Sequence, residues 1–414
     1  SPYIDTTANP SFDYTITNDD KVLPYFVAAS STVVEGDTGS TSAPVKITWD
    51  QDIAANASSL TVSIDAACAA DGCDVAADSN FSSNQSHSIF TTGSDLSSPG
   101  ATGVDVGLTL VTDGVVEPDE VLTLTLTPVD SSYVTVVGSK THAVTIDNDD
   151  KITPYFTAST SSANEGSSNA DAGIKIGWDQ NIAANVPNLS LTVGSTCAAN
   201  GCVVTEDFNY GASESVSVFT TGTAKTAPGG TGETVGLIIT GDTTVEPSED
   251  VTLTLSSTNT DYFTLAGTPT HVRTIANDDQ VIPYFIGSSG AANEGATGQL
   301  DAGVKLTWDQ VIAANVPSLD ISVLTACTAT GCTLTQDINY GASQALAIFT
   351  TGTEKASPGV TGENVGLTIA GDALVEASEV VSLTLSSAAS PYIDTTANPS
   401  FDYTITNDDK VLPY

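Results

Sequence analysis

An Asn-Asp-Asp triplet that leads into a Pro-Tyr pair occurs four times in this chain, with its last residue at Asp20, Asp150, Asp279 and Asp409. The spacings are 130, 129 and 130 residues. A fixed period of this size indicates an array of like domains. Because about 130 residues is an ordinary domain size that can bury its own core, we expect three independently folding repeats, at 21–150, 151–279 and 280–409.

The two ends of the chain carry the same sequence. Residues 1–25 are identical to residues 390–414, although the repeats otherwise differ at many positions. We interpret this as a larger period of 389 residues. The chain is then expected to be part of a longer protein, with 1–20 as the last strands of a preceding repeat and 410–414 as the start of the next. The alternatives are a recombinant or processed product, or a segment 1–20 that is a strand donated to a neighbouring chain.

The charge balance narrows the possible partners. The net charge is −40, from 50 acidic and 10 basic residues. Nucleic acid is excluded, because phosphate binding requires clusters of Lys and Arg. An acidic surface favours cations and keeps a long polymer soluble. At 40% apolar residues the chain is typical of a folded protein rather than of an acidic disordered tail. No run of 18 apolar residues and no signal peptide occur within the given residues, and any secretion signal is expected to lie outside them.

Each repeat contains one short cysteine loop, CAADGC, CAANGC or CTATGC. Zinc is one interpretation, but two thiolates are half of a tetrahedral site, and the histidines do not recur in all repeats. A disulfide within each loop is therefore favoured, which indicates an oxidising, extracellular setting. The predicted pairs are Cys68–Cys73, Cys197–Cys202 and Cys327–Cys332.

Apolar and polar residues alternate in most segments of a repeat. In the first repeat Val45, Ile47 and Trp49 should point into the core and Lys46 to solvent. The segments near 133–137 and 142–146 flank Gly138-Ser139 and predict a hairpin. About seven such strands predict an all-β fold of tandem immunoglobulin-like antiparallel β-sandwiches arranged end to end. A sandwich with strands of ten to twelve residues spans ~35–40 Å, so three in a row should span about 110–140 Å.

Three groups of carboxylates recur at predicted strand ends, where a sandwich brings them together. Because that charge density is repulsive when unpaired, we expect calcium, which accepts six to eight oxygen ligands. In the first repeat the groups are Glu35, then Asp113, Glu117 and Glu120, then Asp147, Asp149 and Asp150; in the second, Glu165, then Asp242, Glu246 and Glu249, then Asp278 and Asp279; in the third, Glu294, then Asp372, Glu376 and Glu379, then Asp408 and Asp409.

An early Glu-Gly, then Asp-x-x-x-Glu-Pro-x-Glu before an alternating strand, and a final Ile-x-Asn-Asp-Asp together resemble the Calx-beta repeat. That resemblance implies a sandwich that binds calcium at the tip where its last strand ends. It supports these carboxylates, except Asp147, as ligands for about two or more calcium ions in each repeat. It adds Asp207 and Asp337 from a further motif, whereas Asp78 is a weaker match. The third repeat has VEASE in place of VEPDE, which removes a proline but no carboxylate.

The leading functional prediction is a structural protein, namely a rigid, calcium-stiffened array that forms an extracellular filament or adhesin shaft on a bacterial surface. Its partners are neighbouring repeats of the same protein, through lateral or end-to-end self-assembly. The alternatives are an adhesin module that binds a glycan or receptor, and a calcium-sensing regulatory domain. An enzyme is disfavoured, because the same carboxylates occur in all repeats and no nucleophile and histidine recur as a pair.

Overall fold

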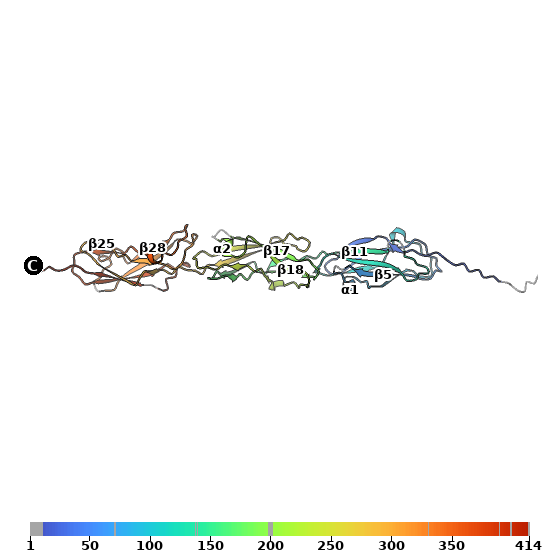
Figure 1. Cartoon of the computed structure of the whole chain (residues 1–414), viewed down its shortest axis with the longest axis horizontal. Helices are drawn as coiled ribbons and strands as arrows, with labels where there is room; N and C mark the ends of the chain where they lie inside the picture. Colours follow the sequence, from blue (N-terminus) through green and yellow to red (C-terminus); the bar gives the residue numbers. More distant parts are fainter. Residues whose placement is uncertain are drawn as a thin grey trace, which may run out of the picture.

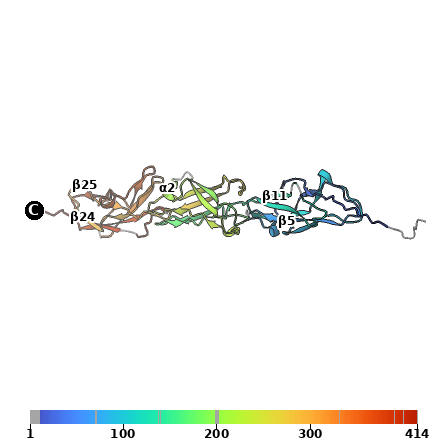
Figure 2. The same cartoon turned by 45° about the vertical axis from the view of Figure 1, so that its right-hand side comes forward.

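The computed structural model describes residues 11–69, 72–136, 138, 140–197, 202–329, 331–388, 390–397 and 400–412. This part of the chain is almost entirely β-structure, in three bodies that follow one another along a single axis (Figures 1 and 2). We call residues 21–150, 151–279 and 280–409 repeats 1, 2 and 3. Among the described residues, no helix is of a length and apolar character that could cross a membrane.

Repeat 1 consists of two facing layers of strands. One layer is a five-stranded sheet in the order β2-β11-β10-β5-β6, and the other contains the sheets β1-β4-β7 and β3-β8. The elements are β1 (Tyr25–Phe26), β2 (Ser30–Val34), β3 (Gly39–Ala43), β4 (Lys46–Thr48), β5 (Leu60–Cys68), α1 (Val75–Asp78), β6 (Gln85–Phe90), η1 (Gly100–Thr102), β7 (Val104–Asp105), β8 (Leu108–Thr112), β9 (Val115–Val116), β10 (Glu120–Pro128) and β11 (Thr141–Asp147).

Repeats 2 and 3 have the same topology, with five-stranded sheets β13-β22-β21-β17-β18 and β24-β32-β31-β27-β28. Repeat 2 contains β12 (Tyr155–Phe156), β13 (Thr160–Asn164), β14 (Ala170–Asp171), β15 (Lys175–Gly177), β16 (Asn181–Ile182), β17 (Leu189–Cys197), α2 (Val204–Asp207), β18 (Ser213–Phe219), η2 (Gly229–Thr231), β19 (Glu233–Thr234), β20 (Ile238–Ile239), β21 (Glu249–Ser256) and β22 (Thr270–Ala276). Repeat 3 contains β23 (Tyr284–Phe285), β24 (Ser289–Asn293), β25 (Gly298–Asp301), β26 (Lys305–Thr307), β27 (Leu319–Cys327), β28 (Ser343–Phe349), η3 (Gly359–Thr361), β29 (Glu363–Asn364), β30 (Thr368–Gly371), β31 (Glu379–Ser386) and β32 (Ser400–Thr406).

The alternating pattern places the core as predicted. Val45, Ile47 and Trp49 are buried, whereas Lys46 is exposed. Along β10, the residues at even spacing from Glu120 to Leu126 are buried and those between them are half-buried. This is the period of two that a strand with one buried face requires. Each repeat therefore has its own cluster of buried side chains.

Two details of the predicted topology are wrong. The sandwich is not wholly antiparallel, because β11 pairs in parallel with β2. The expected hairpin across Gly138 is also absent from the described residues: β11 pairs with β10, and Val134 instead forms a parallel bridge with Val22 of the segment that enters the repeat. Val137 and Ser139 lie outside the described residues. Val134 is fully buried beside the entering segment, which removes its apolar side chain from water.

The segment that joins two repeats is ordered by the second of them. Ile152, two residues after the acidic triplet, is fully buried in repeat 2 and forms a bridge with Phe263. The amide of Thr153 donates a hydrogen bond of 2.7 Å to Asp179 Oδ1. Since every backbone group fixed in this way loses freedom, the joint is a folded element and not a flexible linker.

A loop of the first repeat also crosses the joint. The β9 strand lies after β8 in repeat 1 but pairs in parallel with β16 of repeat 2. The amide of Ala183 donates to the carbonyl of Val116 at 3.0 Å. The side chain of Val116 is fully buried within the core cluster of repeat 2. Val245 occupies the equivalent place in the core of repeat 3, so each following core is completed by the preceding repeat.

Candidate metal centre

The sheet register brings the carboxylates of one repeat to one end. Because β2 and β11 run in parallel, with Val34 opposite Asp147, the residues that follow both strands leave the sheet at the same end of its strands. The antiparallel β10 begins at that end with Glu120, which lies opposite Ile146. Glu35 and the acidic triplet after β11 therefore lie beside Glu120. This end of the repeat is the one that contacts the next repeat.

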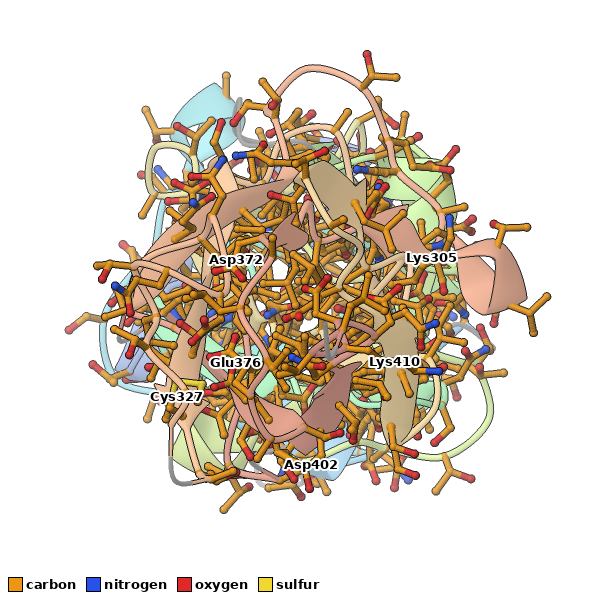
Figure 3. All side chains as sticks on the ribbon, turned by 90° about the vertical axis from the view of Figure 1, so that its left-hand side faces the viewer. Lys305, Cys327, Asp372, Glu376, Asp402 and Lys410 are labelled. Atoms are coloured by element: carbon orange, nitrogen blue, oxygen red, sulfur yellow. A yellow bond between two sulfur atoms is a disulfide. The ribbon has the colours of Figure 1, made fainter. Side chains whose placement is uncertain are left out.

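In two repeats the carboxylates converge tightly enough to share an ion. One oxygen of each member lies within 4.8 Å of the others in two groups, Asp207 with Glu246 and Glu249, and Glu294 with Asp372 and Asp409. Because these groups come from different parts of equivalent sites, they mark two subsites, one beside the cysteine loop and one beside the acidic triplet. Figure 3 views repeat 3 along the axis and shows Asp372 and Glu376 on the same side of the tip as Cys327.

The carboxylates of repeat 1 are held in a state that disfavours their charge. Burial raises the pKa of Glu35 to about 8, and the charges of Glu117 and Asp113 contribute to that rise. Burial, followed by the charge of Asp78, raises the pKa of Glu120 to about 8. Burial and the charge of Asp113 raise the pKa of Glu117 to about 7. Desolvation together with like charges is the signature of a site that needs a positive partner.

The other two repeats share this electrostatic arrangement. Burial raises the pKa of Glu165 to about 8 and that of Glu246 to about 7, with neighbouring carboxylates as the second cause. Burial and the charge of Asp207 raise the pKa of Glu249. In repeat 3, burial raises the pKa of Glu294 to about 6 and also raises that of Glu379, and nearby carboxylates add to both shifts.

Several of these carboxylates have a buried oxygen without a hydrogen-bond partner inside the protein. Within the described residues, the buried oxygens without one include Oδ2 of Asp150 and of Asp279, Oε1 of Glu294, and both Oε atoms of Glu379. The two ion pairs among the described residues, Lys225–Glu233 and Lys355–Glu363, involve none of these carboxylates. Buried charges without partners are costly. A hard divalent cation with oxygen ligands fits this donor set, and calcium fits its irregular geometry.

The cysteine loops lie beside the carboxylates but do not supply ligands. Sulfur atoms group with Asp78, Asp207 and Asp337. All six cysteines are in disulfides within their own loops, with Cα–Cα distances of 5.4 to 5.5 Å. A disulfide sulfur is not a thiolate, and zinc binding by these cysteines requires the thiolate. The bridges instead fasten the loop that precedes each aspartate.

The predicted carboxylates do not all lie in the same surroundings. Asp78, a weak match to the family motif, lies close enough to Glu120 to raise the pKa of that group. In contrast, Asp149 and Asp278 each accept a hydrogen bond from a glycine amide, at 2.9 and 3.0 Å. Asp408 accepts an equivalent bond from Gly295 at 3.2 Å. These three side chains anchor the segment after the first glutamate, which leaves Asp409 to the carboxylate group of repeat 3.

The following repeat contributes a side chain that sequence reasoning missed. Gln180 of repeat 2 donates from Nε2 to Asp150 Oδ1 at 2.8 Å, and Gln310 of repeat 3 donates to Asp279 Oδ1 at 3.3 Å. The signal was present, because Trp-Asp-Gln recurs at the same place in every repeat. Each of these aspartates therefore belongs to a site and to a repeat joint at once.

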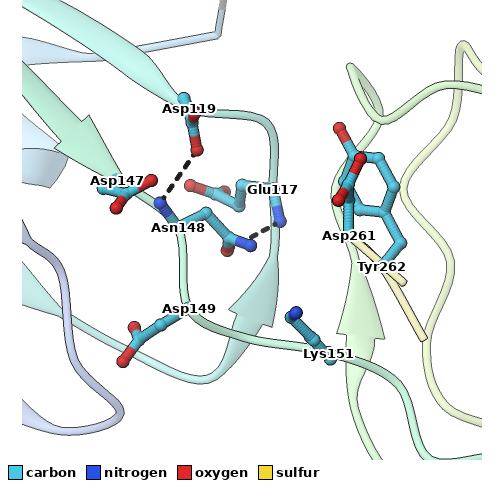
Figure 4. A pocket seen from close by; sticks show the side chains of 8 residues that line it. All are labelled: Glu117, Asp119, Asp147, Asn148, Asp149, Lys151, Asp261 and Tyr262. Atoms are coloured by element: carbon cyan, nitrogen blue, oxygen red, sulfur yellow. Dashed lines mark hydrogen bonds between the residues drawn. The ribbon is translucent and has the colours of Figure 1, made fainter. Parts of the chain in front are cut away.

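A second, outer pocket opens across the same joint. It has a volume of about 590 Å³, and Figure 4 shows acidic side chains of repeat 1 facing Asp261 and Tyr262 of repeat 2. Asn148 holds the repeat 1 side of this pocket in place. Its side-chain Oδ1 accepts a hydrogen bond from the backbone amide of Glu117 at 3.2 Å, and its backbone amide donates to Asp119 Oδ1 at 3.2 Å. Burial and then the charge of Asp119 raise the pKa of Tyr262. A carboxylate of repeat 1 therefore acts electrostatically on a side chain of repeat 2.

We expect Gly72→Ala to weaken the joint between repeats 1 and 2. Gly72 has φ +111°, and a Cβ there would lie 1.8 Å from Asn185 Nδ2 of repeat 2. Gly93→Ala is a matched control, because Gly93 has φ +137° with open space around it. The expected excess loss for Gly72→Ala is about 1–2 kcal/mol in calorimetric unfolding. Equal losses for the two variants would contradict the contact.

Comparisons with known proteins identify no family for this chain. No family model matches it, and no curated protein matches it. Among solved structures, it is similar to the calcium binding domain CBD12 of CALX1.1, with 15% identity over 57% of this chain and 82% of that chain and a TM-score of 0.25. It is also similar to CBD12 from CALX1.2, with 13% identity, coverage of 61% and 99% and a TM-score of 0.21.

A third similar structure is mouse Cadherin-23 EC22-24, with 10% identity over 94% of this chain and 99% of that chain and a TM-score of 0.30. At these identities and scores, the likenesses carry no argument about what this chain binds or does. The tandem β-sandwich fold is established by the sheets and cores of the chain itself.

Proposed function

We propose that this chain is a structural protein, a calcium-stiffened array of repeats that serves as the body of an extracellular filament or the shaft of an adhesin. The observation that carries the proposal is the position of the buried carboxylates. They lie where one repeat meets the next, and Asp150 and Asp279 are hydrogen-bonded by a glutamine of the following repeat. A cation bound there would connect two repeats rather than serve one.

The same carboxylates fix the loop that crosses the joint. Asp113 Oδ1 accepts a hydrogen bond from the amide of Val115 at 2.7 Å, which holds the turn that presents Val116 to repeat 2. Calcium bound by Asp113 and Glu117 would restrain both ends of that turn. Calcium bound by Asp150 would restrain the segment that enters repeat 2. Without a cation, mutual repulsion of these charges loosens both restraints.

An extracellular setting agrees with this role. The three disulfides are of a kind that persists in oxidising compartments, and weak calcium sites are filled where calcium is abundant. The partners in this proposal are other repeats of the same protein. A bacterial surface is the setting that we propose, because the Calx-beta repeat that this sequence resembles also occurs in many large bacterial surface proteins.

Small-angle X-ray scattering tests the proposal on the full chain, with calcium and with a chelator. We expect a straight particle of about 110–140 Å for the three repeats with calcium and a shorter, bent average without it. Asp279→Asn should bend the second joint even with calcium, because an amide oxygen still accepts from Gln310 but carries no charge. Asp320→Asn, at an exposed strand position, is the control.

Identical scattering profiles with and without calcium would rule out calcium as the stiffening element. Calorimetric titration of the metal-free chain separates the two questions in that case. Binding without stiffening would leave a calcium protein that is not a calcium-stiffened rod, and the absence of binding would remove calcium from the proposal altogether.

A further inference from the structure

A glutamine of the following repeat lies at each joint, beside the aspartate that ends the preceding repeat. Gln180 directly precedes β16, and the pairing of β16 with β9 fixes its backbone against the preceding repeat. A Cβ on Gly114 of that repeat would lie 4.0 Å from Gln180 Nε2. Gln310 likewise comes just before Ile312, which forms the equivalent bridge with Val245. The strand pairing that joins two repeats therefore also positions this glutamine.

The glutamine and the aspartate share one hydrogen bond, and each keeps a buried oxygen that has none. Gln180 Nε2 donates to Asp150 Oδ1 at 2.8 Å. Gln310 Nε2 donates to Asp279 Oδ1 at 3.3 Å. Among the described residues, Oε1 of both glutamines and Oδ2 of both aspartates are buried without a hydrogen-bond partner. Both joints thus contain the same two unpartnered oxygens, one from each repeat.

These oxygens lie close enough together for one ion to contact both repeats. The two end atoms of a side-chain amide are ~2.3 Å apart, so Gln180 Oε1 lies within ~5 Å of Asp150 Oδ1. A calcium ion lies about 2.3–2.6 Å from each oxygen ligand and can therefore span oxygens that are ~5 Å apart. Asp409, the equivalent of Asp150 in repeat 3, has an oxygen within 4.8 Å of oxygens of Glu294 and Asp372. The aspartate at this position therefore belongs to a carboxylate cluster of the size that one ion needs.

The chemistry of the two free oxygens fits a cation. An amide oxygen and a carboxylate oxygen are both acceptors, so they cannot satisfy each other. Asp150 is only 2% exposed. Burial raises its pKa to about 6, although the hydrogen bond from Gln180 lowers it. A water molecule could donate to both oxygens, but it brings no positive charge to a group of like charges. Calcium supplies that charge, and it accepts amide oxygens as ligands.

We propose that Gln180 and Gln310 are calcium ligands, so that the ion at each joint is bound by carboxylates of one repeat and by an amide oxygen of the next. The aspartate contacts the ion through its free oxygen and keeps its hydrogen bond to the glutamine Nε2. Such a site is complete only when two repeats are joined. This inference rests on the proposed function, and it names the group of the following repeat through which calcium couples the two.

Calorimetric titration of the metal-free full chain with calcium tests the inference. Gln180→Ala and Gln310→Ala each remove one amide oxygen. We expect the affinity for one ion at the altered joint to fall by about tenfold or more, because loss of even an outer partner of a metal ligand has a cost of that size. Gln299→Ala changes an exposed glutamine on β25 and is the matched control, which should bind calcium like the parent.

A conservative variant separates a ligand from a residue that only positions Asp150. Gln180→Glu keeps an oxygen at the same place but removes the N–H donor. A ligand role predicts that this variant binds calcium at least as tightly as the parent. A positioning role predicts that it loses affinity as Gln180→Ala does, because the hydrogen bond to Asp150 is lost in both variants.

Bound water gives a direct readout of the ligand count. Europium(III) occupies oxygen sites of the calcium type, and its luminescence lifetimes in water and in deuterium oxide report how many water molecules the ion carries. In the double variant Gln180→Ala/Gln310→Ala, the mean number of bound waters should rise, because water takes the position of each lost amide oxygen. Gln299→Ala should leave the number unchanged.

The results distinguish failure of this inference from failure of the proposed function. A parent chain that binds no calcium would overturn both. A parent chain that binds calcium and straightens, together with alanine variants of unchanged affinity and unchanged bound water, would overturn this inference alone. Equal loss of affinity in Gln180→Ala and Gln180→Glu, with no change in bound water, would also overturn it, because the glutamine would then act only through Asp150.

Discussion

Replacing Val245 with aspartate is expected to destabilise repeat 3 and to uncouple it from repeat 2. Val245 is fully buried in the core of repeat 3, although it belongs to a loop of repeat 2. A carboxylate there is either expelled from the core or buried without a partner, and both outcomes remove the pairing with Val311 and Ala313. The expected loss is about 3–5 kcal/mol in the free energy of unfolding of repeat 3.

The chain supplies its own control for this prediction. Val375→Asp makes the same chemical change at the equivalent loop position, but that side chain is 54% exposed. We expect it to change stability by less than about 0.5 kcal/mol, as at other surface positions. Calorimetry should show an earlier unfolding transition for Val245→Asp alone, and scattering should show a bent particle. Equal effects of the two variants would mean that Val245 does not act through the core of repeat 3.

The metal-free chain is expected to lose stability as the pH rises, and calcium should reverse that loss. The pKa of Glu165 rises from 4.5 to about 8 on folding, and that of Glu246 from 4.5 to about 7. Their protonated forms favour the folded state, so this contribution is complete below about pH 4.5 and is lost as the pH passes through about 7 to 8. Calcium binds the ionised forms, and it should raise the melting temperature by about 10 °C at pH 8 and little at pH 5.

Proton release gives an independent measure of the same linkage. At pH 7 a carboxyl group with a pKa of about 8 is mostly protonated, so binding of calcium must displace protons. Titration calorimetry in buffers of different ionisation enthalpy should detect them. Glu249→Gln should raise the melting temperature of the metal-free chain at pH 8 and weaken calcium binding, whereas Glu214→Gln, at an exposed position, should do neither. Calcium binding without proton release would contradict the raised pKa values.

The periodicity of this sequence was enough to predict the class of fold. Alternation of apolar and polar residues depends only on the strand period, so the buried faces at Val45 to Trp49 and along β10 follow from local pattern. The spacing of the acidic triplets likewise predicts where one repeat leads into the next, and these boundaries stay a prediction. The parallel pairing of β2 with β11 was not predictable in this way, because a short strand has the same pattern in either direction.

The sequence assigned the carboxylates of the candidate site, and that assignment stays a prediction. Carboxylates at strand ends could be assigned from motif and spacing, whereas Gln180 and Gln310 enter the site from another repeat. Asp78 was ranked below its equivalents because the motif around it differs, yet its carboxylate lies beside Glu120. Proximity across a joint depends on how two repeats are oriented, and no pattern within one repeat contains that information.

The sequence by itself determined that the chain is a series of like β-sandwiches with acidic ends, because strand periodicity, charge and repetition are local properties. Only the tertiary structure decided how the series is held together. It placed Val116 and Val245 inside the cores of the following repeats. The pattern within one repeat does not show that its valine enters the core of the next, because that burial depends on how two repeats pack together, which is a property of the assembled fold.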